Sequence, residues 1–245
     1  MTRINKEKLA SINQGMEKAH NRKPGFKTLL GRHQKPNPNI SDPNETLKGV
    51  SIVKDMIEEG YNIYDVLQDY GKGAITSKDD THSAPRKWEK WLGGRGDGDP
   101  SPDTKHSEIK LNEVHEKHEL PHNNPVLNIG AIQPKRAPDY DSFEDSSCYK
   151  KMQNMWVTTH YDNYSKIAGT FVFKIDNPLW FDRVKEDYEF FLKTYKNRRD
   201  AGLRSSKSSI VSSTLSSPNG TLQVRSDAIM MSKQFFREVS KYYDK

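Results

Sequence analysis

The stretch Glu89–Lys110, EKWLGGRGDGDPSPDTKHSEIK, decides how the middle of the chain folds. Its central part, GGRGDGDPSP, is almost entirely Gly, Pro, Asp and Ser, so it cannot form the interior of a helix or a strand. The residues before it, 84–92, place two tryptophans and a leucine on one face and predict a short helix. The residues after it, 107–114, read SEIKLNEV and alternate broadly between polar and apolar, which predicts a half-buried strand.

Charged residues gather where this turn meets the strand. Alternation along a strand puts Glu108 and Lys110 on one face and turns Ile109 toward the core. Asp103, on the adjoining turn, is able to reach the Glu108 side. Two carboxylates and a backbone carbonyl, such as that of Ile109, make an oxygen site suited to Mg²⁺, and Lys110 beside it is placed to orient a water. Metal-assisted phosphodiester hydrolysis needs these groups, although the pattern by itself is short and arises by chance in a chain rich in Asp, Glu and Lys.

Other metal sites compete with this one. Asp97 and Asp99 are rival carboxylate ligands in the same stretch. Four histidines form a loose cluster: His106, His115, His118 and His122. Pro121 interrupts any helix that would place the last two on one face, and zinc sites normally need closer pairing of Cys or His ligands. Surface histidines on a polar loop are therefore the preferred interpretation.

The rest of the chain predicts a mixed α/β domain with helices flanking one small mixed sheet. Further helices are expected at 45–70, 146–154, 177–199 and 228–243, and further strands at 125–132, 155–157, 169–175 and 221–225. The Ser-rich run 204–220 is expected to be a flexible loop. Residues 1–43 are expected to form a basic N-terminal helix and arm, and residues 44–245 the main domain.

Composition and charge limit the classes of protein. The 245 residues carry a net charge of +6, with basic ends and an acidic centre: nine Lys/Arg against two acids in residues 1–40, and seventeen against twenty-four in residues 41–182. This pattern fits a protein that binds a polyanion and holds divalent cations at its middle, and it fits equally well a basic tail on an ordinary solvated surface. The single cysteine, Cys148, suits a reducing cytoplasm and is expected to be a buried structural thiol. No apolar run approaches bilayer length, so we expect a cytoplasmic protein that does not bind membranes.

The order of several blocks resembles the MutH family within the PD-(D/E)xK nucleases, which contains a mismatch-repair nicking endonuclease and type II restriction endonucleases. The active-site signature is matched by Glu89-x-x-Leu-Gly, Pro-Asp103 and Glu108-Ile-Lys110. Later blocks are similar to the family's lysine-bearing helix, tryptophan-led helix, DNA-contacting strand and terminal helix: Tyr149–Val157, Trp180–Phe191, Leu222–Arg225 and Ser232–Phe236. The blocks follow the family order from about residue 72 to residue 236.

The resemblance implies a restriction-endonuclease-like fold and a Mg²⁺-dependent DNA endonuclease. It implies that Asp103 and Glu108 bind metal and that Lys110 serves the attacking water. Glu89 would be an accessory acid. Lys151 would be an additional active-site lysine, with Lys150 its close rival and otherwise a DNA contact. Arg225 and Lys233 would bind DNA from a C-terminal part at 177–245, and the catalytic core would cover about 84–157.

The chain departs from the family pattern in three places. Asp103 and Glu108 are only five residues apart, so the turn between them must be tight. Ser226 and Asp227 follow Arg225 where the family has proline and lysine, and Met230 stands where it has tyrosine. The positions of Ser226, Asp227 and Met230 read DNA sequence in members of that family. The resemblance therefore implies the cleavage chemistry and leaves the recognition sequence open.

We therefore expect a sequence-specific type II restriction endonuclease, prokaryotic or phage-encoded, acting on double-stranded DNA beside a possible cognate DNA methyltransferase. Two alternatives stay open: a methyl-directed mismatch-repair nicking endonuclease and a catalytically silent DNA-binding module. The sequence does not fix the oligomeric state.

Overall fold

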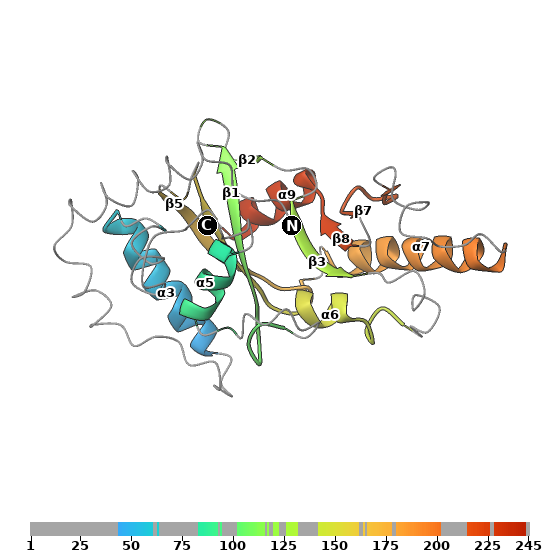
Figure 1. Cartoon of the computed structure of the whole chain (residues 1–245), viewed down its shortest axis with the longest axis horizontal. Helices are drawn as coiled ribbons and strands as arrows, with labels where there is room; N and C mark the ends of the chain where they lie inside the picture. Colours follow the sequence, from blue (N-terminus) through green and yellow to red (C-terminus); the bar gives the residue numbers. More distant parts are fainter. Residues whose placement is uncertain are drawn as a thin grey trace. The chain divides into compact units, whose positions relative to one another are not determined.

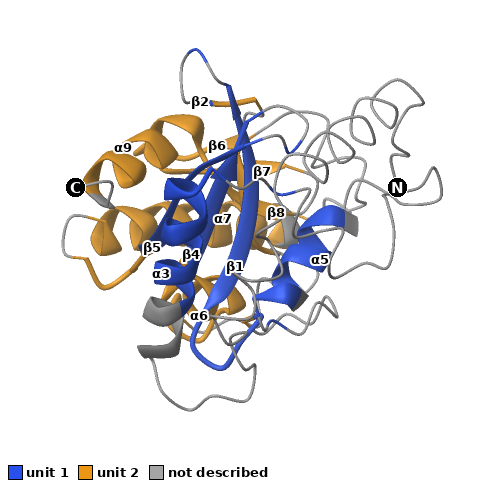
Figure 2. Ribbon diagram, turned by 90° about the vertical axis from the view of Figure 1, so that its left-hand side faces the viewer, with its two compact units in different colours: residues 1–99, 103–120, 156–172 blue, residues 100–102, 121–155, 173–245 orange. Residues whose placement is uncertain are grey.

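The computed structural model describes residues 44–60, 63, 83–92, 94, 102–115, 117, 120–122, 126–131, 142–161, 164, 166–177, 180–201, 215–225 and 228–243. The chain divides into two compact units, coloured separately in Figure 2. Unit 1 comprises residues 1–99, 103–120 and 156–172, and unit 2 comprises residues 100–102, 121–155 and 173–245. The predicted arm at 1–43 lies outside the described residues.

The first sheet has the strand order β2-β1-β4-β5. Its strands are β1 (Glu108–His115), β2 (Leu120–Pro121), β4 (Met155–His160) and β5 (Ile167–Phe173). Two helices accompany it in unit 1, α3 (Asn44–Glu58) and α5 (Ser83–Trp91) (Figure 1). The connection from β4 to β5 is closed by a 2.9 Å hydrogen bond from the backbone nitrogen of Tyr161 to the carbonyl of Lys166.

Tryptophans fill the core between these helices and the sheet. Trp88 and Trp91 of α5 stack with ring centroids 5.4 Å apart, and both are buried in the cluster that contains Ile109 and Trp156. Gly49 of α3 is needed at its position, because a Cβ there would lie 2.3 Å from the Trp156 ring. The helices therefore seal the face of β1 from which Ile109 projects.

The second sheet, in unit 2, is antiparallel and has the order β3-β8-β7-β6. Its strands are β3 (Leu127–Ala131), β6 (Leu215–Ser216), β7 (Leu222–Arg225) and β8 (Ala228–Met231). One face is apolar and buried, because Leu222, Val224, Ile229 and Met231 alternate with polar or partly exposed residues.

Three helices belong to unit 2: α6 (Ser147–Met152), α7 (Phe181–Asp200) and α9 (Lys233–Tyr243). Helix α6 packs closely on β3, since a Cβ at Gly130 would lie 3.2 Å from the Cα of Cys148. Aromatic rings pack around Phe235 of α9. Its ring centroid lies 5.1 Å from that of Trp180, just before α7, and 5.7 Å from that of Phe173, the last residue of β5.

The mixed α/β class expected from the sequence is confirmed, but the expectation of one small sheet is wrong. The strand at 127–131 joins the C-terminal strands in a separate sheet. Residues 228–231 were expected to begin the last helix and instead form β8. Ser232 explains the late start of α9, because its Oγ accepts a 3.1 Å hydrogen bond from the backbone nitrogen of Phe235 in the manner of an N-cap.

The Ser-rich run 204–220 was expected to be a flexible loop. Residues 204–214 of this run lie outside the described residues, and its end, 215–220, forms β6 and a turn closed by a hydrogen bond from the Gly220 nitrogen to the Ser217 carbonyl. Among the described residues, no helix has the length and apolar character needed to cross a bilayer.

Candidate active site at the start of strand β1

Glu108 and Lys110 meet on one face of β1, as the strand alternation predicts. Lys110 Nζ contacts Glu108 Oε1. The Glu108 side chain is fully buried, whereas the Lys110 side chain is 20% exposed. Ile109 points the other way and is fully buried in the tryptophan core. The core packing of Ile109 therefore fixes the direction of both charged neighbours.

The Asp103 carboxylate comes from the turn before β1 and lies beside the backbone of Ile109. Its Oδ2 accepts a 2.8 Å hydrogen bond from the backbone nitrogen of Ile109, the residue between Glu108 and Lys110. In an extended strand the N–H and C=O of one residue point to the same edge. The Ile109 carbonyl therefore faces the edge at which the Asp103 carboxylate lies and can serve there as a further oxygen donor.

Thr104 makes the tight turn between the two carboxylates. Its backbone nitrogen donates to the carbonyl of Ser107 at 2.9 Å, and its Oγ1 donates to the same carbonyl at 3.1 Å. Oγ1 also accepts from the backbone nitrogens of His106 and Ser107, at 3.2 and 2.8 Å. This closure explains how five residues suffice to bring Asp103 back to β1.

Thr104 was not predicted from the sequence to be part of the site. The sequence feature that could have identified it is a hydroxyl side chain directly after an aspartate in a turn, where Ser and Thr form hydrogen bonds with the nearby backbone.

Glu89 lies on α5 and approaches β1 from the Ile109 side. The backbone nitrogen of Gly94 donates to the Glu89 carbonyl at 2.7 Å, and a Cβ at Gly94 would lie 3.3 Å from Cδ1 of Ile109. The Glu89 side chain is half-buried. These contacts place the backbone of Glu89 near Ile109, and an accessory role for its side chain stays a prediction.

The chemistry of the donors suits a hard cation. Two carboxylates and the Ile109 carbonyl offer oxygen only, which is the preference of Mg²⁺. No group of three or more His, Cys, Asp or Glu side chains gathers as a metal cluster within the described part of the chain. Of the predicted rivals, Asp97 and Asp99 lie outside the described residues, while His115 and His122 are exposed, as expected for surface histidines.

The two lysines of α6 differ in exposure. Lys150 is exposed and Lys151 is half-buried. Both belong to unit 2, so the approach of either lysine to the Asp103–Lys110 cluster stays a prediction. Cys148 on the same helix is buried, and burial raises the pKa of its thiol to about 12. The expected structural role of this cysteine agrees with its burial.

Two of the predicted DNA-contacting residues, Arg225 and Lys233, lie on the C-terminal part of unit 2. Arg225 is exposed at the end of β7, and Lys233 is half-buried at the start of α9. Met230 of β8 lies directly opposite Gln223 of β7. Met230 is thus a cross-strand neighbour on the strand that pairs with the one carrying Arg225.

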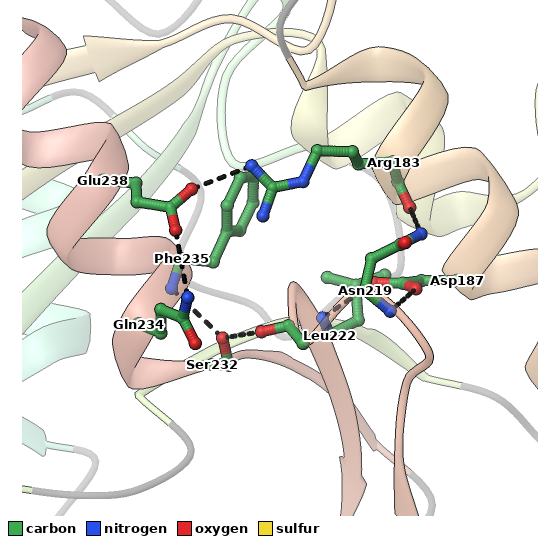
Figure 3. A network of polar contacts seen from close by, with 9 residues as sticks. Arg183, Asp187, Asn219, Leu222, Ser232, Gln234, Phe235 and Glu238 are labelled. Carbon is green, nitrogen blue, oxygen red and sulfur yellow. Dashed lines mark hydrogen bonds and ion pairs between the residues drawn. The ribbon is translucent and has the colours of Figure 1, made fainter.

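A polar network holds the beginning of β7 (Figure 3). Asp187 of α7 is fully buried and accepts hydrogen bonds from the backbone nitrogens of Asn219 and Leu222, at 3.1 and 3.2 Å. Burial raises the pKa of this carboxyl, and the hydrogen bonds partly offset the effect.

From the other side, the Oγ of Ser232 donates to the carbonyl of Gly220, whose φ of +66° suits a residue without a side chain. Arg183 and Glu238 join α7 to α9 with a 2.8 Å ion pair, also drawn in Figure 3. The turn before β7 is therefore fixed by both helices. The sequence around Asp187 did not predict that it holds the turn before β7, since an aspartate within a long helix is ordinarily solvated.

Comparison of the chain with protein-family models gave no match, and comparison with curated proteins gave none.

Proposed function

We propose that the protein is a Mg²⁺-dependent, sequence-specific DNA endonuclease of the type II restriction kind, built on a restriction-endonuclease-like fold. The observation that carries the proposal is the convergence of Asp103, Glu108 and Lys110 around the backbone of Ile109. The residue spacing allowed this convergence without requiring it. A charged edge strand with its acids in water would have exposed Glu108, which is instead buried.

Each residue has a role in this proposal. Asp103, Glu108 and the Ile109 carbonyl would hold the magnesium ion, which supplies charge stabilisation to a phosphate and acidifies water. Lys110 would orient the attacking water and stabilise negative charge on the phosphate oxygens. The bond from the water oxygen to phosphorus would form while the bond from phosphorus to the leaving oxygen breaks; the attacking water would lose a proton to solvent, and the leaving oxygen would take a proton from solvent. Glu89 and Lys151, with Lys150 as the rival of the latter, would assist as accessory acid and second lysine.

DNA would be bound chiefly by the basic C-terminal part of the chain. Residues 183–245 carry thirteen Lys/Arg against seven acids. Arg225, Lys233 and Lys150 are the proposed contacts, and contacts of this kind to phosphate supply most of the salt-dependent affinity for DNA. A methyltransferase that modifies the same sequence would be the natural partner of a restriction enzyme.

One observation favours a second candidate, a DNA-binding module without cleavage activity. The Glu108 carboxylate is closed off from solvent and held by Lys110, whereas a metal ligand must become accessible to its ion. A silent module would keep Glu108 and Lys110 as a structural ion pair.

Digestion of a fully sequenced, unmethylated plasmid tests the proposal. The purified protein is expected to convert supercoiled plasmid to linear fragments when Mg²⁺ is present and to leave it intact in EDTA, and the mapped ends should share one sequence. Open circles without linear product would favour a nicking enzyme. An intact plasmid at every Mg²⁺ concentration, with DNA binding retained, would favour the silent module.

A further inference from the structure

Asn112 lies on the same face of β1 as the charged pair. It follows Lys110 by two residues, and alternation along the strand turns it to the side of Glu108 and Lys110. Asn112 is only 6% exposed. Its Nδ2 atom is buried and has no hydrogen-bond partner in the described part of the protein.

A buried amide nitrogen without a partner destabilises a protein, because its hydrogen bonds to water are lost on folding and not replaced. Leucine has nearly the same shape and would avoid this cost at a buried strand position. A polar group in such a place calls for an explanation, and the common ones are a catalytic role or an ordered water that the amide holds.

The distances along an extended strand suit a shared water. Residues two apart on one face are separated by about 6.6 Å at Cα, and one water that accepts two hydrogen bonds of about 2.8 Å bridges donors about 5 Å apart. Lys110 Nζ is a donor, as is Asn112 Nδ2, and Glu108 is an acceptor for the protons of such a water. A single water suits Asn112 better than a DNA phosphate does, because Nδ2 is closed off from solvent.

We propose that Asn112 is a positioning residue of this site, which holds, together with Lys110, the water that attacks the phosphate. The inference rests on the proposed endonuclease function and adds a residue that the active-site signature does not contain. Asn112 donates through Nδ2 to the water oxygen, while Lys110 donates from the other side. The unfavourable burial of the amide is then the cost of placing the water.

The test measures thermal stability, kcat, KM and DNA affinity of Asn112→Leu and Asn112→Asp. Measured without Mg²⁺ and DNA, when no attacking water is held, Asn112→Leu should raise Tm by about 2–4 °C, because it removes a buried polar group that then has no partner. It should also lower kcat by about 10- to 100-fold, as loss of a supporting hydrogen-bond partner commonly does, while KM and DNA affinity measured in Ca²⁺ stay within twofold. Asn112→Asp should lower kcat by a similar factor, because it replaces the donor with an acceptor.

Thr221→Val is the matched control. Thr221 is fully buried, its Oγ1 has no hydrogen-bond partner in the described part of the chain, and valine has the same shape. This variant should raise Tm in the same way and leave kcat unchanged. If Asn112 affected only stability, Asn112→Leu would raise Tm without lowering kcat, as Thr221→Val should. A higher Tm together with a lower kcat at Asn112 alone therefore indicates a role in the reaction.

Three results would overturn the inference. The first is a kcat of Asn112→Leu within twofold of wild type while wild type and Thr221→Val cut DNA, which leaves the proposed function standing. The second is a fall of Tm in Asn112→Leu, since the amide would then have a stabilising partner within the protein. The third is an absence of Mg²⁺-dependent cutting in every variant and in wild type, which removes the proposed function as well.

Discussion

Asp103 and Ile109 are joined by a 2.8 Å hydrogen bond from the backbone nitrogen of Ile109 to Oδ2 of Asp103. This bond ties the end of a Gly- and Pro-rich turn to the strand residue whose side chain anchors the tryptophan core. The packing of the unit 1 core therefore sets the geometry of the candidate site. Changes that loosen either the turn or the strand should affect the site before they affect the fold.

Thr104→Ala should loosen the turn that presents Asp103. The change removes a hydroxyl that donates to the Ser107 carbonyl and accepts from two backbone nitrogens. We expect a loss of about 1–2 kcal/mol in the free energy of unfolding, measured with urea, and a lower kcat for plasmid cleavage. Thr104→Ser keeps the hydroxyl and should retain most of both. Equal behaviour of the two variants would show that the hydroxyl does not shape the turn.

The Glu108–Lys110 pair should behave as a coupled unit in a double-mutant cycle. Lys110→Met leaves the buried carboxylate without its ammonium partner and should destabilise the protein more than Glu108→Gln combined with Lys110→Met does. We expect a coupling energy of about 1–3 kcal/mol from urea unfolding of the two single variants and the double variant. Additive single effects would mean that the ion pair contributes nothing in solution.

Asp187 should give the stability of unit 2 a distinct pH dependence. Its pKa is raised above the ordinary value of 3.8 because the carboxyl is buried. The folded state therefore takes up a proton at higher pH than the unfolded state, and the contribution of this group to stability grows as the pH falls through the raised pKa and is lost as the pH rises through it.

Asp187→Asn tests this sign. The variant keeps one acceptor but turns an amide N–H toward a backbone N–H, so it should lose about 1–3 kcal/mol near neutral pH. The gap between wild type and variant should widen as the pH falls toward 3.8, because only wild type gains from protonation. Urea unfolding at several pH values measures the gap. A gap that narrows with falling pH would contradict the raised pKa.

Arg225→Ala should weaken DNA binding through phosphate contact. We expect lower affinity in low salt and a decrease of about one in the slope of log affinity against log salt. Arg86→Ala removes an exposed arginine from α5, outside the basic C-terminal part, and serves as the control, with little change in slope. Fluorescence anisotropy with a DNA duplex at several salt concentrations gives both slopes. Indistinguishable slopes for the two variants would remove Arg225 from the interface.

Local patterns predicted the elements well where side chains alone set the conformation. Alternation in 107–114 predicted β1 and the shared face of Glu108 and Lys110, and the tryptophan spacing in 84–92 predicted α5. Both features depend on residues close in sequence, so the sequence displays them directly.

Long-range pairing was harder to predict. The strand at 127–131 pairs with 228–231, about a hundred residues away, and nothing in its own pattern indicates a second sheet. The error at 228–231 has a local cause: AIMM is apolar enough for either a helix or a strand, and only Ser232 marks where α9 begins. Asp187 and Asn112 could not be identified because their importance depends on burial, which the strand and helix patterns do not show.

Cleavage of an unmethylated plasmid by wild type and by Asp103→Ala, with DNA binding measured on the same preparations, distinguishes a nuclease site from a structural cluster. We expect Mg²⁺-dependent cutting by wild type, a loss of at least about 100-fold in Asp103→Ala, and DNA affinity that stays within a few-fold. Cutting by Asp103→Ala at the wild-type rate would rule out the Asp103 site as the place of cleavage.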